Sequence, residues 1–145
     1  MARVLIIDDE EDVLLAVSRR LKREGYDVTP ASNSEQGMGK ILQADLPYDV
    51  IVTDMSMEDP ASGLAVLQTA FSRDLFAEVI VMTAYGNVAN AVECMKRGAF
   101  DYVEKNQPGV DTYEVLAEKV RAALDRRLRD IRTVELWERA AHAQV

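Results

Sequence analysis

Side chains of the kinds that handle phosphate stand just after short apolar stretches of this chain. Asp8 and Asp9 open an acidic run, and Asp54, Thr83 and Lys105 each lie at the end of a later stretch. Carboxylate oxygens are hard ligands that suit Mg²⁺. A lysine, a hydroxyl and a divalent cation stabilise phosphoryl oxygens as they gain charge in transfer. A carboxylate beside them can attack phosphorus and become an aspartyl phosphate.

The apolar stretches that precede these residues have the character of buried β-strands. They carry continuous apolar residues without polar alternation, which is typical of a parallel sheet covered on both faces. The segments between them have helical spacing, and Gly25 and Gly98 stand where two of these helices would end. The expected strands are Val4–Ile7, Tyr26–Thr29, Val50–Thr53, Val79–Met82 and Phe100–Val103.

Strand and helix alternate five times, which predicts an α/β fold with a doubly wound, five-stranded parallel sheet of the flavodoxin-like type. Ligands of such sheets bind beyond the carboxyl ends of the strands. Taken singly, the acids could favour a helix N-terminus and Lys105 could be a surface lysine, so the phosphoryl hypothesis depends on their convergence. Gly37 and Gly39 each cost the second helix about 1 kcal/mol relative to alanine, so we expect that helix to be the least stable.

Composition excludes several other classes of protein. The 145 residues suit one domain, and a net charge of −8 argues against direct nucleic-acid binding by the domain. Cys94 and His142 are the only residues of their types, which excludes a disulfide scaffold and argues against a zinc site or a histidine-dependent catalytic centre. No apolar run approaches a membrane helix or a signal peptide, so we expect a cytoplasmic protein without membrane contact.

The chain closely resembles the receiver domain of two-component response regulators from residue 3 to about residue 124. The resemblance is carried by Val4-Leu5-Ile6-Ile7-Asp8-Asp9-Glu10, by Asp54 with Met57, by Val81-Met82-Thr83-Ala84-Tyr85-Gly86 and by Gly98-Ala99-Phe100-Asp101-Tyr102-Val103-Glu104-Lys105. The last two stretches look most like receivers of sigma-54-type enhancer-binding regulators.

The resemblance implies that Asp54 accepts a phosphoryl group from a sensor histidine kinase or a phosphotransfer protein. Asp9, Asp54 and the backbone carbonyl of Ser56 would bind Mg²⁺ directly, and Asp8 would hold a metal-bound water. Lys105 would pair with the phosphoryl oxygens. The protein would catalyse only its own phosphoryl transfer and dephosphorylation, and would not otherwise be an enzyme.

The resemblance also implies a switch. Thr83 would turn inward to hydrogen-bond the phosphoryl group, and Tyr102 would move from an exposed to a buried position as Thr83 moves. The signal would then be read at the surface formed by the fourth helix, the fifth strand and the fifth helix.

Two departures from the family pattern affect the site. The proline expected after Met57 is replaced by Glu58, and with Asp59 the loop is one residue longer and places two extra carboxylates near the metal site. Lys105 is followed by Asn106 where the family usually has a cis proline. A cis non-proline bond costs about 2.5–4 kcal/mol, so we expect either a trans bond with a rearranged loop or a strained cis bond.

From Asp111 to about Ala141 the apolar spacing predicts one helix of about thirty residues, about 45 Å long and longer than a small domain is wide. We assign residues 1–124 to a receiver domain and residues 125–145 to a helical extension. The extension has three interpretations: a linker toward a further domain, a dimerisation or partner-binding arm, and an arginine-rich nucleic-acid arm that acids interrupt.

Two other functions compete with the phosphorylation switch. A pseudo-receiver would use the same fold as an interaction module without phosphorylation, and retention of the site residues disfavours it. A flavodoxin-like or haloacid-dehalogenase-type phosphatase would place its chemistry after the first strand. The acidic run that begins at Asp8 repels the anionic phosphate of a flavin, and a phosphatase of that type would leave Asp54 and Thr83 unexplained.

Overall fold

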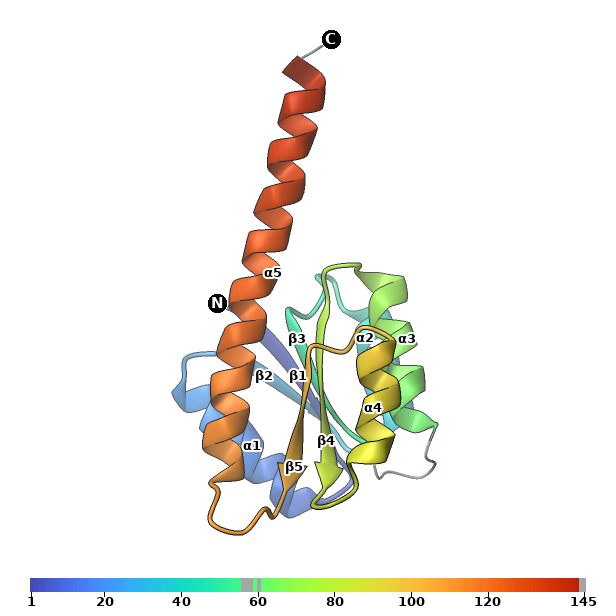
Figure 1. The fold of residues 1–145 in the computed structure, drawn as a ribbon, viewed down its shortest axis with the longest axis vertical. Helices are drawn as coiled ribbons and strands as arrows, with labels where there is room; N and C mark the ends of the chain where they lie inside the picture. Colours follow the sequence, from blue (N-terminus) through green and yellow to red (C-terminus); the bar gives the residue numbers. More distant parts are fainter. Residues whose placement is uncertain (56–58, 60, 144–145) are drawn as a thin grey trace.

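The computed structural model describes residues 1–55, 59 and 61–143, in which strands and helices alternate along the chain (Figure 1). The five strands form one parallel sheet in the order β2-β1-β3-β4-β5. The elements are β1 (Arg3–Ile7), α1 (Glu11–Arg23), β2 (Asp27–Ala31), α2 (Ser34–Gln43), β3 (Val50–Asp54), α3 (Ser62–Arg73), β4 (Glu78–Ala84), α4 (Val88–Lys96), β5 (Asp101–Lys105) and α5 (Thr112–Ala143). The predicted doubly wound fold is confirmed.

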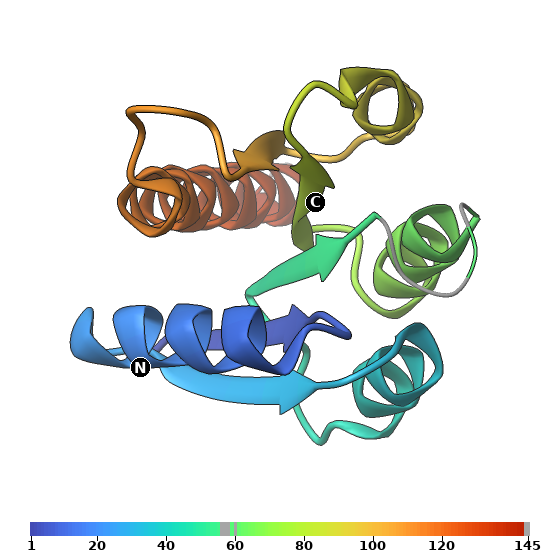
Figure 2. The same cartoon turned by 90° about the horizontal axis from the view of Figure 1, so that it is seen from below.

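Helices cover the sheet on both faces, with α1 and α5 on one and α2, α3 and α4 on the other (Figure 2). Each face has its own apolar cluster, and alternate residues of a central strand enter opposite clusters. Leu5 and Ile7 of β1 point to the α2–α4 face, whereas Val4 and Ile6 point to the α1 and α5 face. This two-sided burial explains why the strands are continuous apolar runs.

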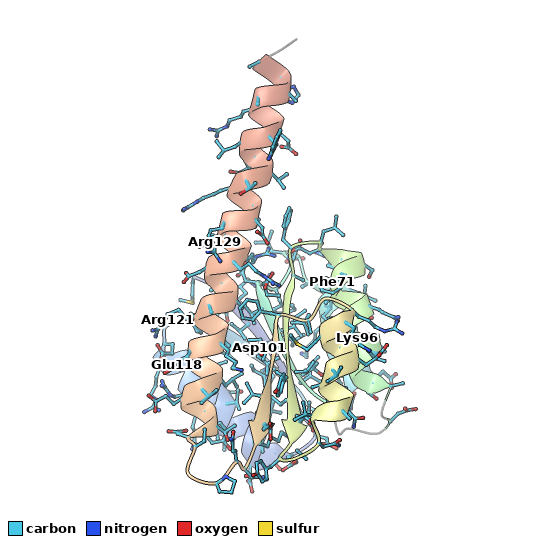
Figure 3. The ribbon with its side chains drawn as sticks, viewed as in Figure 1. Phe71, Lys96, Asp101, Glu118, Arg121 and Arg129 are labelled. Atoms are coloured by element: carbon cyan, nitrogen blue, oxygen red, sulfur yellow. The ribbon has the colours of Figure 1, made fainter. Side chains whose placement is uncertain are left out.

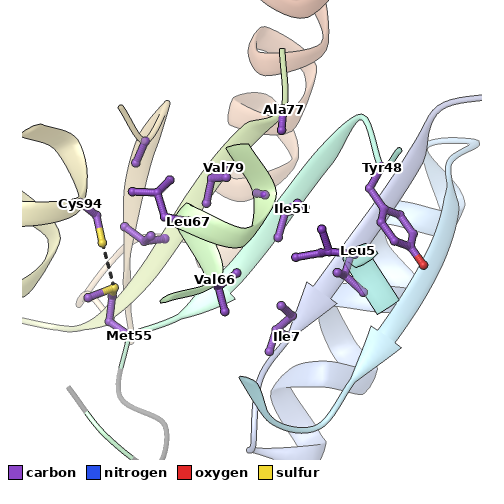
Figure 4. Close-up of a cluster of buried hydrophobic side chains, with 14 of the residues drawn as sticks. Leu5, Ile7, Tyr48, Ile51, Met55, Val66, Leu67, Ala77, Val79 and Cys94 are labelled. Carbon is purple, nitrogen blue, oxygen red and sulfur yellow. Dashed lines mark hydrogen bonds between the residues drawn. The ribbon is translucent and has the colours of Figure 1, made fainter. Parts of the chain in front are cut away.

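Buried sulfur atoms link α4 to the end of β3 on the α2–α4 face. Cys94 of α4 lies 3.5 Å from Met55, measured between the two sulfur atoms, and Met55 directly follows β3 (Figure 4). Burial raises the pKa of the Cys94 thiol, because the charged thiolate is disfavoured in an apolar environment. Cys94 therefore acts as a small apolar core residue.

Packing against the sheet explains why a glycine stands at position 37, although glycine has low helix propensity. It is buried in α2, and a Cβ atom at this position would overlap with the side chain of Ile7 on β1. The glycine lets the helix backbone approach the sheet more closely than any other residue would. Glycine at this position therefore lowers the helix propensity of α2 but allows α2 to pack closely on β1.

The last helix extends far beyond the domain. It has 32 residues, and its buried members all lie in its first half: Leu116, Ala117, Val120 and Ala123. The helix runs unbroken through residue 124 and projects from the pole opposite the carboxyl ends of the strands (Figure 1). The predicted long helix is confirmed, and the boundary predicted at residues 124 and 125 falls inside one continuous element.

Two arginines fasten α5 where it leaves the domain, and we call them with their partners the arginine clamp. Arg127 donates to Asp49 Oδ1 at 2.9 Å and to Asp74 Oδ2 at 2.7 Å. Arg126 pairs at 2.7 Å with Glu78, whose side chain is only 4% exposed. Burial raises the pKa of Glu78 although the Arg126 hydrogen bond opposes the shift. The clamp joins α5 to the starts of β3 and β4.

Along the described part of the chain, no helix combines the length and hydropathy that crossing a bilayer requires.

Replacing Arg127 with methionine tests the clamp. The change keeps the alkyl stem but leaves Asp49 and Asp74 without their shared cation, so we expect the free energy of unfolding to fall by about 1–3 kcal/mol. Arg129→Met is the matched control, because Arg129 is exposed on the projecting part of α5 (Figure 3). Urea unfolding of both variants measures the difference, and equal stabilities would show that the clamp contributes nothing.

Candidate functional site

The ends of three parallel strands bring one lysine among three carboxylates. Asp8 directly follows β1, Asp54 ends β3 and Lys105 ends β5. The Nζ atom of Lys105 lies 2.8 Å from Asp8 Oδ2 and 3.3 Å from Asp54 Oδ2. It also lies 3.3 Å from Glu10 Oε1 at the more exposed rim. The predicted convergence of Asp8, Asp54 and Lys105 is therefore present.

Four acidic residues at this edge place carboxylate oxygen atoms close together. One carboxylate oxygen each from Asp8, Asp9, Glu10 and Asp54 lies within 4.8 Å of all the others. Asp8 and Asp54 are buried, whereas Asp9 and Glu10 are exposed, so the group opens to solvent on one side. A donor set made only of oxygens suits a hard cation such as Mg²⁺. Ser56, the expected carbonyl ligand, lies outside the described residues.

Electrostatics make Lys105 and its acids one unit. Burial raises the pKa of Asp8, while hydrogen bonds from Lys105 and from the backbone N–H of Glu10 lower it in part. Burial alone would lower the pKa of Lys105, but the hydrogen bond to Asp8 and the charge of Asp54 raise it above its usual value. The ammonium group therefore stays charged and neutralises buried carboxylates that would otherwise repel each other.

Thr83 lies near the end of β4, and its hydroxyl group is engaged with the loop that leads into α4. The buried hydroxyl donates a hydrogen bond of 2.7 Å to the backbone carbonyl of Asn87. The same loop is held from β5, because the N–H of Gly86 donates to Glu104 Oε2 at 3.2 Å. Two neighbouring strands thus each contribute one side chain that fixes this loop.

Tyr102 lies on β5, three residues before Lys105, and its ring is half-buried. It packs against the apolar cluster that includes Ala91 and Cys94 of α4. The ring therefore lies where a movement of α4 or of its preceding loop would reach it.

The residue after Lys105 resolves one of the sequence alternatives. The described residues contain no cis peptide bond, and Asn106 has a φ of 58° in the left-handed region. Asparagine adopts this region more readily than most residues, because its short polar side chain can hydrogen-bond locally. Of the two alternatives, the trans bond is confirmed, and Lys105 still reaches Asp8 and Asp54.

The lengthened loop after β3 is described only in part. Glu58 lies outside the described residues, as does Ser56. The Oδ1 atom of Asp59 accepts a hydrogen bond of 2.8 Å from the N–H of Ala61, just before α3. Asp59 does not belong to the group of four acids among the described residues. Its carboxylate instead accepts the Ala61 N–H and supports the turn before α3.

Sequence reasoning missed the contributions of two glutamates. Glu10 contacts Lys105, and its place in the acidic run was a usable signal. Glu104 binds the Gly86 N–H from a neighbouring strand, and no local pattern indicates that contact.

Comparison with known proteins agrees with this geometry. A family model described as response regulator receiver domain matches residues 4–117. A putative NtrX-like response regulator of Rickettsia bellii is 37% identical over 103 residues, which are 70% of this chain and 21% of that protein. The regulatory protein AtoC of Escherichia coli is also 37% identical over 103 residues, 71% of this chain and 22% of that protein. The chain spans about a fifth of the length of these curated relatives.

Solved structures have the same fold. A response regulator receiver domain protein from Clostridium thermocellum is 31% identical, with a TM-score of 0.77 over 88% of this chain and 97% of that chain. The response regulator protein TrrA from Thermotoga maritima, crystallised in complex with Mg²⁺ and beryllium fluoride, is 27% identical with a TM-score of 0.70. That match covers 86% of this chain and all of that one.

The lysine-centred charge group predicts a pH dependence of stability. The pKa of Asp8 is raised above 3.8, so the folded state holds its proton to higher pH than the unfolded state. The stabilisation that this proton brings is complete below the unfolded pKa and is lost as pH rises through the folded pKa. Lys105→Met removes the ammonium group and raises that folded pKa further.

As pH rises above the ordinary carboxyl pKa of 3.8, we therefore expect Lys105→Met to lose about 1–2 kcal/mol more free energy of unfolding than the wild type loses. Urea titrations in a chelating buffer measure the difference. Lys96→Met is the matched control, because Lys96 is exposed on α4 (Figure 3). If Lys105→Met and wild type lose stability in parallel, Lys105 does not neutralise the buried acids.

Proposed function

The chain belongs to the family of response regulator receiver domains, whose model matches residues 4–117, and we propose that it is a phosphorylation-operated switch with Asp54 as its phosphoryl acceptor. The observation that carries this proposal is the contact of one ammonium group, that of Lys105, with both Asp8 and Asp54. A nucleophilic carboxylate beside a fixed cation is what phosphoryl transfer to aspartate requires.

The phosphoryl donor is a phosphohistidine of a sensor histidine kinase or of a phosphotransfer protein. An Asp54 carboxylate oxygen attacks phosphorus, and the new O–P bond forms as the donor's P–N bond breaks. The electron pair of the broken bond returns to the imidazole nitrogen, which takes a proton from solvent. Lys105 stabilises the charge on the phosphoryl oxygens as they separate from the donor.

The acids of the site fit Mg²⁺, and we propose that Asp8, Asp9 and Asp54 hold it. Asp9 and Asp54 would bind the ion directly with the carbonyl of Ser56, and Asp8 would bind one of its waters. When bound, the ion would neutralise the clustered carboxylates and the phosphoryl oxygens. Support comes from the four acidic oxygens within 4.8 Å of one another.

Phosphorylation is read at the surface formed by α4, β5 and α5. The Thr83 hydroxyl gives up the Asn87 carbonyl and binds the phosphoryl group, and the Tyr102 ring moves into the space that Thr83 leaves. The aspartyl phosphate adds charge and acceptor oxygens, which drive this exchange. The protein works in the cytoplasm and catalyses its own phosphorylation and dephosphorylation and no other reaction.

Incubation with acetyl phosphate and Mg²⁺ should add one phosphoryl group to the chain, measured by intact mass. Asp54→Asn should abolish the adduct because it removes the nucleophilic oxygen, and Asp9→Asn should require more Mg²⁺ for the same yield. Asp59→Asn is the matched control, because Asp59 lies outside the group of acids. The absence of an adduct in the wild type would favour the pseudo-receiver, and an adduct that persists in Asp54→Asn would show that another residue is the acceptor.

We further propose that the projecting part of α5 pairs with that of a second copy. Leu128 is 52% exposed, Leu136 64% and Trp137 73%, on a helix that the domain does not cover there. The apolar residues Leu124, Leu128, Ile131, Val134 and Leu136 are spaced by 4, 3, 3 and 2 residues. This spacing does not match a heptad repeat, so a short antiparallel helix pair fits better than a long coiled coil. Burying these side chains would stabilise the dimer by about 25 cal/mol per Å² of apolar surface.

Sedimentation equilibrium of the full chain tests the pairing. We expect a dimer, and we expect Trp137→Glu to shift it to monomer by at least about tenfold in dissociation constant, because a charge must then be buried in the interface. Arg129→Glu, which changes an exposed side chain of the same helix segment, should leave the equilibrium within about threefold. A wild-type chain that remains monomeric with and without beryllium fluoride would contradict the pairing.

A further inference from the structure

Tyr102 lies on β5, an edge strand of the described sheet, and side chains hold its backbone there. β5 is the last strand in the sheet order. The carbonyl of Tyr102 accepts a hydrogen bond of 2.8 Å from Lys119 Nζ of α5. The N–H of Tyr102 donates to Asp101 Oδ1, also at 2.8 Å. The backbone N–H and carbonyl groups of Tyr102 therefore both form hydrogen bonds with charged side chains.

Lys119 makes two further contacts at the same place. Its Nζ atom pairs with Asp101 Oδ2 at 3.0 Å, and it lies 5.5 Å from the centroid of the Tyr102 ring. The side chains of Lys119 and Asp101 are 29% and 33% exposed, so solvent does not fully screen the pair. Figure 3 labels Asp101 on β5 beside α5. One ammonium group thus touches the backbone, the ring and the neighbouring carboxylate of the same tyrosine.

We propose that Lys119 is a positioning residue that holds Tyr102 in its unphosphorylated position and couples its movement to α5. This role rests on the phosphorylation switch proposed above. A cation attracts the face of an aromatic ring only within about 6 Å of its centroid. When the Tyr102 ring turns away, Lys119 loses that attraction, and the first half of α5 loses one of its attachments to β5.

The position of Lys119 along α5 gives this coupling a path. Lys119 stands two turns before Arg126 and Arg127, which the arginine clamp attaches to the starts of β3 and β4. The helix is therefore attached to the sheet by charged groups at two levels. A change at Lys119 acts on a helix whose exit point is fixed, and the same helix carries the projecting segment.

Thermodynamic linkage separates this role from that of a simple staple between α5 and β5. A contact of equal strength in both states of the switch does not alter the affinity for a ligand that selects one state. A contact that favours the unphosphorylated state opposes such a ligand, and its removal must tighten binding by the same factor.

Beryllium fluoride with Mg²⁺ is the probe, titrated on the full chain by calorimetry, while the ring signals of labelled tyrosine are followed by NMR. We expect Lys119→Met to bind about fivefold more tightly than wild type, which corresponds to the loss of one charged contact. In the absence of the probe, its Tyr102 ring signals should shift toward their bound position. Lys119→Arg keeps the cation and should restore wild-type affinity.

Two other variants sharpen the result. Lys22→Met removes one exposed lysine of α1 and should leave the affinity unchanged. Asp101→Asn removes the ion pair but keeps the oxygen that accepts the Tyr102 N–H, so it should tighten binding by less than Lys119→Met.

Unchanged or weaker binding by a folded Lys119→Met would overturn the positioning role while leaving the phosphorylation switch intact. Failure of the wild-type chain to bind beryllium fluoride would overturn the switch itself, and the role of Lys119 with it. Thermal unfolding of each variant establishes that it is folded in the assay.

Discussion

The contact of Lys105 with Asp8 and Asp54 is the interaction on which the site depends. Asp8 and Asp54 are each 1% exposed, so their carboxylates would repel each other strongly without a counter-charge, and burial raises the pKa of Asp8. The lysine ammonium at 2.8 and 3.3 Å from them allows both to remain close in a folded domain. It also leaves a fixed positive charge where phosphoryl oxygens would gather. The Lys105 ammonium group therefore contributes both to the stability of the fold and to the chemistry of the site.

This contact constrains the rest of the architecture. Asp8, Asp54 and Lys105 come from three different strands, and they meet because β1, β3, β4 and β5 run parallel and end at one edge. Lys105 contacts both acids although Asn106 follows it in place of proline, with a trans peptide bond and a φ of 58° at Asn106. Gly37 contributes to the same architecture because it allows α2 to pack closely on β1.

Helix α5 connects the two poles of the domain. It contacts Asp101 and Tyr102, the first residues of β5, through Lys119, and the arginine clamp fixes it to Asp49, Asp74 and Glu78 at the pole opposite the functional site. Its remaining turns then project with exposed apolar side chains. The same helix therefore contacts Tyr102 of β5 and carries the projecting segment.

The amino-acid sequence was sufficient to predict the doubly wound fold, the long last helix and the approach of Asp8, Asp54 and Lys105. The apolar pattern of the strands indicates a parallel sheet, and the strands of such a sheet end at one edge. Four features became visible only in the folded structure: the trans geometry at Asn106, the packing of Gly37 against Ile7, the support of the loop after β4 by two strands, and the partners of Lys119 and Arg127. Most of these features depend on contacts between residues far apart in the chain. The spacing of neighbouring residues does not indicate which distant side chain forms an ion pair with a given residue or packs against it.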